Sequence, residues 1–180
     1  MGLQNDIGYV EPRANTIQRA AQRLVSHPSL SPTLTRLADR VDRVLLRVSR
    51  GKVSASNTIV AFPTIVLITT GARSGETRET PLVAVPIGDD LAVVGSNGGS
   101  GGIPGWVHNL RAHPGASVSY GQRQADVVAR ELEDSQHDEV FAAAARIYPG
   151  FAGYRERADY KIPVFVLARA SDADEREEQS

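Results

Sequence analysis

The chain has 180 residues, of which 41% are hydrophobic, and its formal net charge is −1. These values predict one domain with a sizeable core, and the near-neutral charge argues against a nucleic-acid-binding protein. The absence of cysteine excludes disulfides, thiolate catalysis and cysteine metal sites. No apolar run has membrane-spanning length, and the first residues lack the features of a signal peptide, so we expect a cytoplasmic protein.

The N-terminal third is basic and is predicted to contain two helices. Residues 1–12 are expected to form a tail, and a helix over 13–26 ends before Pro28. Ser31-Pro32 begins a second helix, over 32–50, which carries an apolar face and a separate arginine face. Such a basic helix is typical of a solvated surface, of peripheral contact with an anionic membrane (here the inner face), or of a site for an anionic ligand. The arginines are Arg36, Arg40, Arg43, Arg47 and Arg50.

From Thr64 onward the pattern changes to short strands and turns, with helices mostly outside them. This order favours an α+β fold built on a small antiparallel barrel. We expect one domain over 13–169, with helices in 13–52 and the barrel in 57–169, followed by an acidic disordered tail over 170–180. The predicted strands are 64–70, 80–87, 90–95, 116–120, 124–132 and 162–167, and the predicted helices are 105–112 and 134–147.

The segment Gly71–Arg78 joins the first two predicted strands and is the most informative part of the sequence. Its two glycines permit positive φ angles and close backbone approach. Arg73 and Arg78 carry planar guanidinium groups that suit phosphate or carboxylate. A solvated hairpin is the plain alternative, and the residues alone leave both interpretations open.

A second glycine-rich segment, residues 95–104, separates a predicted strand from a predicted helix. Its Gly98–Gly102 part formally matches a serine nucleophile elbow, but strand and helix do not adjoin Ser100 directly, so we predict no nucleophile there. Backbone amides in such a loop can instead approach a flat or anionic ligand. The four histidines lack metal-ligand spacing, and no metal site is predicted.

Aromatic residues mark two further segments. Trp106 follows the glycine loop, and Asn109 lies on the same face of the predicted helix. Tyr148, Phe151 and Tyr154 recur at three-residue spacing. Both sets are compatible with core packing and with the wall of a ligand pocket.

Three motifs in order resemble those of the deazaflavin-dependent nitroreductases. The first is Thr69-Thr70-Gly71-x-Arg73-Ser74-Gly75-x-x-Arg78-x-x-Pro81-Leu82. The second combines Gly95-Ser96-Asn97-Gly98-Gly99 with Pro104-x-Trp106-x-x-Asn109-Leu110. The third is Tyr148-Pro149-x-Phe151-x-x-Tyr154, followed by Ile162-Pro163-Val164. The resemblance extends from Thr64 to Leu167, and the three motifs together are much more specific than any one of them.

The resemblance implies a split antiparallel β-barrel, related to FMN-binding pyridoxamine-oxidase-like proteins, and the 8-hydroxy-5-deazaflavin coenzyme F420. FMN is the less favoured cofactor. The residues implied to hold the phosphate and glutamate tail are Arg73, Ser74, Gly75 and Arg78. Those implied to border the ring are Pro81, Ser96, Asn97, Gly98, Trp106 and Asn109. Those implied to lie near the substrate are Tyr148, Phe151, Tyr154 and Trp106.

Two positions depart from the family pattern. Ala72 stands where members often carry a basic residue, and Phe151 stands where some carry a tyrosine. A phenyl ring cannot donate a hydrogen bond, which argues against nitroimidazole reduction. We therefore expect an F420H2-dependent reductase that passes a hydride to a quinone-like acceptor, with no obligatory catalytic side chain. The alternatives are an enone or nitroaromatic reductase and a non-catalytic carrier of F420 or FMN.

Overall fold

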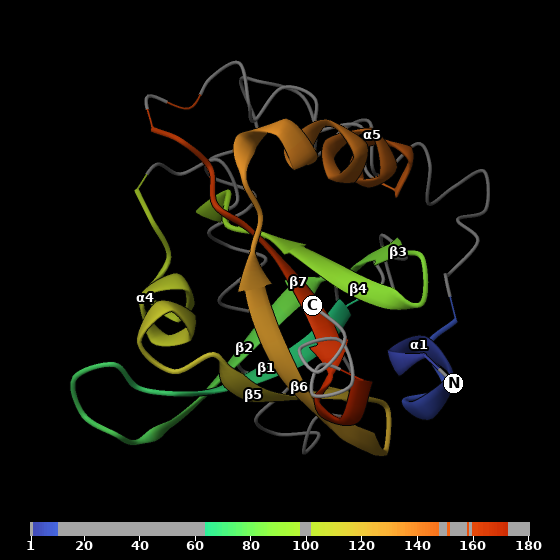
Figure 1. The fold of residues 1–180 in the computed structure, drawn as a ribbon. Helices are drawn as coiled ribbons and strands as arrows, with labels where there is room; N and C mark the ends of the chain where they lie inside the picture. The colour runs from blue at the N-terminus through green and yellow to red at the C-terminus, as the bar shows by residue number, and fades with distance from the viewer. Residues whose placement is uncertain are drawn as a thin grey trace, which may run out of the picture.

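The computed structural model describes residues 2–10, 64–97, 102–147, 151, 158 and 160–172. Figure 1 shows a curled sheet with helices around it. Its helical elements are α1 (Leu3–Asp6), α4 (Gly105–Ala112), the 3-10 turn Asp134–Gln136 and α5 (His137–Ile147). Its strands are β1 (Thr64–Thr70), β2 (Thr77–Val83), β3 (Val85–Ile87), β4 (Asp90–Val94), β5 (Gly115–Tyr120), β6 (Arg123–Glu131) and β7 (Val164–Arg169).

The seven strands form one sheet in the order β2-β1-β5-β6-β7-β4-β3, and every neighbouring pair is antiparallel. Two prolines within strands, Pro81 in β2 and Pro86 in β3, lie on the two edge strands, where a missing N–H costs no ladder hydrogen bond. The sheet curls into a half-barrel, which confirms the expected α+β split-barrel fold.

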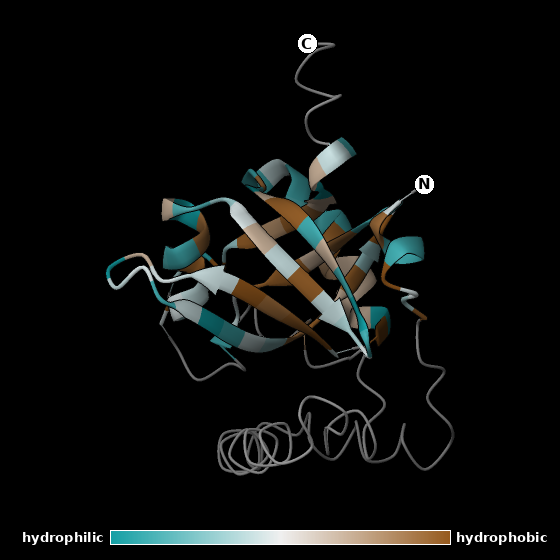
Figure 2. Ribbon diagram, turned by 90° about the horizontal axis from the view of Figure 1, so that it is seen from below, coloured by the Kyte–Doolittle hydropathy of each residue, from teal (hydrophilic) through white to brown (hydrophobic). Residues whose placement is uncertain are grey.

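Each face of the sheet has its own core. The inner face of the half-barrel buries Leu67, Trp106, Leu110 and Phe165 with residues of α1. On the other face, α5 packs against β3 and its neighbours through Phe141 and Ala144. The strand β4 is buried along its whole length because it lies between the two cores. In Figure 2 brown, hydrophobic stretches run along strands of the sheet, while the helices carry both brown and teal residues.

The main differences between the predicted and observed element boundaries lie in the first hairpin and at the last strand. The backbone pairing of Thr70 with Thr77 extends the first hairpin, so β2 begins at Thr77 rather than at residue 80. The predicted strand 80–87 is divided at Ala84 into β2 and β3. The last strand begins at Val164 rather than at residue 162. Polar sequence in β2 concealed its beginning, because an edge strand is exposed and needs no apolar alternation.

The N-terminus also differs from the expectation of a tail over 1–12. Leu3 and Ile7 are 0% and 1% exposed and belong to the inner core. Gln4 further holds this segment in place, because its side-chain amide donates to the carbonyls of Gly88 and Asp90 at 2.9 Å each.

The expected helices over 13–26 and 32–50 and most of the acidic tail lie outside the described residues. Among the helices that the structure describes, none combines the length and apolar character that a bilayer crossing requires.

Candidate coenzyme-binding site

The segment between β1 and β2, residues 71–76, is a compact turn that we call the arginine turn. The Gly71 amide donates to the Glu76 carbonyl, and the Gly75 amide donates to the Gly71 carbonyl, both at 2.8 Å. The Glu76 amide donates to the Ser74 hydroxyl oxygen at 3.3 Å. Internal hydrogen bonds therefore define the path of the chain, although the side chains of residues 72–76 are exposed.

The two glycines of the arginine turn occupy different local environments. Gly75 has φ +68°, in the left-handed region where a Cβ is unfavourable. A Cβ on Gly71 would lie 2.6 Å from Ser74 Oγ and 3.1 Å from the Glu76 carbonyl oxygen. Of the two predicted properties, positive φ is found at Gly75, and close approach of neighbouring atoms is found at Gly71.

One side chain of α4 anchors the arginine turn to the rest of the fold. Asn109 Oδ1 accepts a hydrogen bond from the Ala72 amide at 3.0 Å, and Asn109 Nδ2 donates to Thr69 Oγ1 at 3.0 Å. Thr69 is 2% exposed, so this second bond lies at the edge of the core. Asn109 thus contacts the turn and the end of β1.

The hydrogen bonds in the arginine turn use most of its backbone amides and leave a small set of donors for a ligand. Four of its amides, those of Gly71, Ala72, Gly75 and Glu76, already donate hydrogen bonds within the protein. The amides of Arg73 and Ser74 and the Arg73 guanidinium make no hydrogen bond or ion pair to a described residue. One cation beside two N–H groups is a suitable set for a phosphate or carboxylate.

Arg78 has a different environment, because its guanidinium contacts Glu76 Oε2 at 2.7 Å. Both side chains are more than half exposed, so this ion pair contributes little to stability and leaves donors of Arg78 available. Of the two arginines that the sequence analysis selected, Arg78 therefore has a carboxylate partner, whereas Arg73 has none among the described residues.

The predicted ring-binding residues at the end of β4 lie beside the start of β7. The Gly95 amide donates to the Pro163 carbonyl at 2.8 Å, and Tyr160 donates to the Gly95 carbonyl at 3.3 Å. Ser96 is buried, whereas Asn97 is exposed and has φ +50°. A non-glycine residue with this backbone is uncommon, and such residues occur often at binding sites.

Two aromatic residues assigned to the pocket are instead core residues. Trp106 is 5% exposed, and its ring centroid lies 5.7 Å from that of Phe165 with the planes at 66°. Phe151 is also 5% exposed and packs in the core beneath α5. Of the two alternatives that the sequence left open, the structure supports core packing for both. Gly98, Tyr148 and Tyr154 lie outside the described residues.

Antiparallel order brings the predicted segments to one end of the sheet. β1 and β4 both end there, while β2 and β7 both begin there, so the arginine turn, Pro163 and Ser96 share that end. In Figure 1 the β1–β2 hairpin extends from the sheet next to α4. The structure thereby places residues from all three motifs at one end of the sheet.

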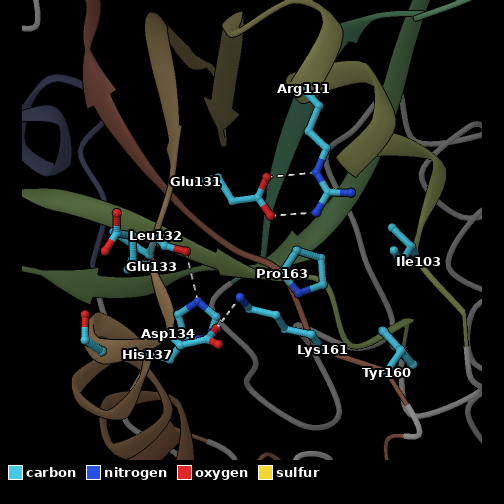
Figure 3. Close-up of a pocket in the computed structure, with 11 residues that line it drawn as sticks. Ile103, Arg111, Glu131, Leu132, Glu133, Asp134, His137, Tyr160, Lys161 and Pro163 are labelled. Atoms are coloured by element: carbon cyan, nitrogen blue, oxygen red, sulfur yellow. Dashed lines mark hydrogen bonds and ion pairs between the residues drawn. The ribbon is translucent and has the colours of Figure 1, made fainter.

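A cavity that the sequence analysis missed lies at the same end. Its volume is about 630 Å³. We call it the charged cavity, and Figure 3 shows its walls coming from α4, the end of β6, the start of α5 and the approach to β7. It is lined by Ile103, Arg111, Glu131, Leu132, Glu133, Asp134, Ser135, His137, Tyr160, Lys161 and Pro163.

The cations of the charged cavity are paired. Arg111 binds both carboxylate oxygens of Glu131, through Nε at 2.8 Å and a terminal nitrogen at 2.6 Å. These hydrogen bonds lower the pKa of Glu131 and raise that of Arg111, against an opposing effect of desolvation. Lys161 Nζ contacts Asp134 at 2.9 Å. The cavity therefore offers polar walls in which both cations already have carboxylate partners.

Histidine does not create a metal site in this part of the molecule. His137 is buried, and its Nε2 lies 3.1 Å from the Leu132 carbonyl oxygen, to which it donates. Across the described ranges, no group of three or more histidine, aspartate and glutamate side chains could hold a metal ion.

Comparisons with known proteins agree with the sequence motifs. Residues 40–169 match the model of the F420H2-dependent quinone reductase family, a range that includes all seven strands, α4 and α5. An F420H2-dependent quinone reductase of Mycobacterium tuberculosis is 34% identical over 114 residues, which are 61% of this chain and 75% of the relative.

Two solved structures extend the comparison. One, described as an F420-H2 dependent reductase, has a TM-score of 0.54 and 38% identity, and the match covers 58% of this chain and 93% of that one. The other, described as a domain-swapped dimer, has a TM-score of 0.56 and 33% identity, with coverage of 76% and 99%. Both structures are more than 30% identical to this chain.

Proposed function

The chain belongs to the F420H2-dependent quinone reductase family, and on this premise we propose that it transfers a hydride from reduced coenzyme F420 to a quinone-like acceptor. It is an oxidoreductase, its cofactor is coenzyme F420, and its substrates are small molecules. The acceptor, the hydride-transfer step and the residue assignments below are our proposals.

The arginine turn is the observation that carries the proposal. Arg73 and the amides of Arg73 and Ser74 would hold the anionic tail, with Arg78 as a further cation and Gly75 as the residue that shapes the backbone. These donors fit a phosphate or carboxylate in charge and in chemistry. No metal ion is needed for this contact.

The ring would lie along the same end of the sheet, beside the end of β4. Ser96, Asn97 and Gly98 would border it there, and Pro81 would border it from the edge strand β2. Trp106 and Asn109 would support the residues that border the ring rather than contact it. Trp106 is buried in the core, and both the oxygen and the nitrogen of the Asn109 side chain are hydrogen-bonded within the protein. We still predict that Tyr148 and Tyr154 lie near the bound acceptor.

When bound, the reduced coenzyme supplies the hydride, so the protein's task is to orient the two reactants and to exclude water. A quinone suits this chemistry because it is flat and accepts a hydride at carbonyl-conjugated positions. Phe151 is buried and carries no donor group, so it cannot protonate a nitro group. This favours a quinone over a nitroimidazole, with enones and other nitroaromatics as the second candidate class.

The experiment is stopped-flow oxidation of reduced F420 by a soluble naphthoquinone, an enone and a nitroaromatic, each with and without the protein. We expect the naphthoquinone to be accelerated most, and we expect FMN to bind more weakly than F420 in titrations. A Ser100→Ala variant serves as a control and should retain full activity. If no acceptor reacts faster than in the protein-free solution, the proposed acceptor class is wrong.

Location and assembly extend this proposal. We keep the hypothesis of a cytoplasmic enzyme that reaches the inner membrane face through the basic helix 32–50, which lies outside the described residues. Salt-reversible co-sedimentation with anionic but not neutral vesicles would support it. One similar structure is described as a domain-swapped dimer, so the mass of this protein in solution is a second measurement to make.

A further inference from the structure

We propose that Asn109, together with Thr69, is a positioning residue that fixes the anion-facing amides of the arginine turn, and that it does not bind the coenzyme ring. This inference rests on the proposed function, because it assigns how the anionic tail is recognised. It revises the ring-side role that the family resemblance implies for Asn109.

The amide group of Asn109 is engaged at both ends by protein atoms. Its oxygen accepts from the Ala72 amide, and its nitrogen donates to Thr69 Oγ1, each at 3.0 Å. Thr69 lies 40 residues away in sequence and Ala72 lies 37 away, so this one side chain joins α4 to the end of β1 and to the turn. Such a bridge cannot arise from local turn chemistry.

The anchored amide is the one immediately before the two that remain available. Holding the Ala72 N–H fixes the start of the exposed segment, and the Gly75 amide bound to the Gly71 carbonyl fixes its end. Arg73 and Ser74 lie between these two anchors. Their N–H groups are therefore presented by a preorganised loop, which lowers the ordering cost of binding an anion.

The other member of the bridge, Thr69, is 2% exposed and so cannot contact a ligand at the surface. Its hydroxyl oxygen accepts from Asn109, and its own proton points to the Arg78 carbonyl at a long 3.5 Å. Thr69 thus orients the Asn109 amide: with its nitrogen held by Thr69, its oxygen faces Ala72. Exchange of the hydroxyl for a methyl group should remove this orientation with almost no change in volume.

The test compares Thr69→Val, Thr69→Ser and Asn109→Ala with wild type and with His108→Ala, an exposed neighbour on α4. Each protein is titrated with F420 and with the same deazaflavin lacking its phosphate and glutamate tail. We expect Thr69→Val and Asn109→Ala to weaken F420 binding about 2- to 10-fold. Binding of the tail-less compound should stay at its wild-type value, and Thr69→Ser and His108→Ala should bind both ligands as wild type does.

A second readout needs no coenzyme. Hydrogen exchange at the Ala72 amide should accelerate in Asn109→Ala and Thr69→Val, because its acceptor is lost or displaced. An equal loss of affinity for both compounds, or unchanged exchange at Ala72, would overturn the positioning role. If Asn109→Ala does not fold, the Thr69→Val and Thr69→Ser pair still decides the matter. Failure of wild type to bind F420 would instead contradict the proposed function, so the two failures are distinguishable.

Discussion

Two arginines on opposite sides of α4 have opposite surroundings. Arg73, in the arginine turn, has no carboxylate partner among the described residues. Arg111, in the charged cavity, is held by both oxygens of Glu131. The helix itself separates them, because Asn109 faces the turn and Arg111, two residues later and roughly 200° around the helix, faces the cavity.

The difference shows why the presence of arginine alone does not identify an anion site. A guanidinium that is already bidentate on a carboxylate has little attraction left for a ligand phosphate, whereas an uncompensated one beside free amides has much. The arginine turn therefore suits the anionic tail of the coenzyme. In the charged cavity both cations, Arg111 and Lys161, already have a carboxylate partner, so neither is available to such a tail.

The largest expected effect tests this contrast directly. Arg73→Ala should weaken F420 binding about 10- to 100-fold, because a charge-assisted contact is lost. Arg111→Ala should leave the affinity at its wild-type value, although it removes the same charge. Fluorescence titration at two salt concentrations measures both, with Arg146→Ala on α5 as an exposed control for net charge. Equal losses for Arg73→Ala and Arg111→Ala would contradict the assignment of the tail to the turn.

A smaller effect concerns the backbone of the turn. Gly75→Ala should destabilise the protein by about 1–2 kcal/mol, because alanine is strained in a left-handed conformation. Gly105 is the matched control: it has open space around its Cβ position and lies in a helix, where alanine should be neutral or stabilising. Denaturant unfolding of both variants checks this. A Gly75→Ala protein as stable as wild type would show that the turn rearranges easily.

The smallest effect belongs to the charged cavity. Because the folded state lowers the pKa of Glu131, its contribution to stability is complete above the ordinary glutamate pKa and is lost as pH falls through the lower folded value. The side chain of Arg111 is 41% exposed and that of Glu131 is 35% exposed. We therefore expect this ion pair to contribute less than about 1 kcal/mol to the free energy of unfolding.

Unfolding free energies of wild type and Glu131→Gln, measured from neutral to acidic pH, test this expectation. The variant should be the less stable at neutral pH, and the difference should shrink on acidification. Glu139→Gln, at an exposed position of α5 without an ion pair to a described residue, is the control. A difference that stays constant or grows toward acidic pH would contradict the assigned pKa direction.

Local chemistry in the sequence determined much of this protein. The apolar run rich in β-branched residues in 64–70 predicted β1, and the spacing of glycine and arginine predicted the position of the arginine turn. These features could be predicted because strand period, glycine φ and guanidinium chemistry act over a few residues. The motif order also sufficed to identify the family and the coenzyme.

Tertiary structure alone decided which of these groups are available. The bridge from Asn109 to Ala72 and Thr69, the pairing of Arg111 with Glu131 and the burial of Leu3 and Trp106 each join distant parts of the chain. No local pattern encodes them, because they depend on which strand ends and helix faces the antiparallel sheet brings together. For the same reason the sequence showed two arginines for an anion but could not show which amides beside them were already bonded.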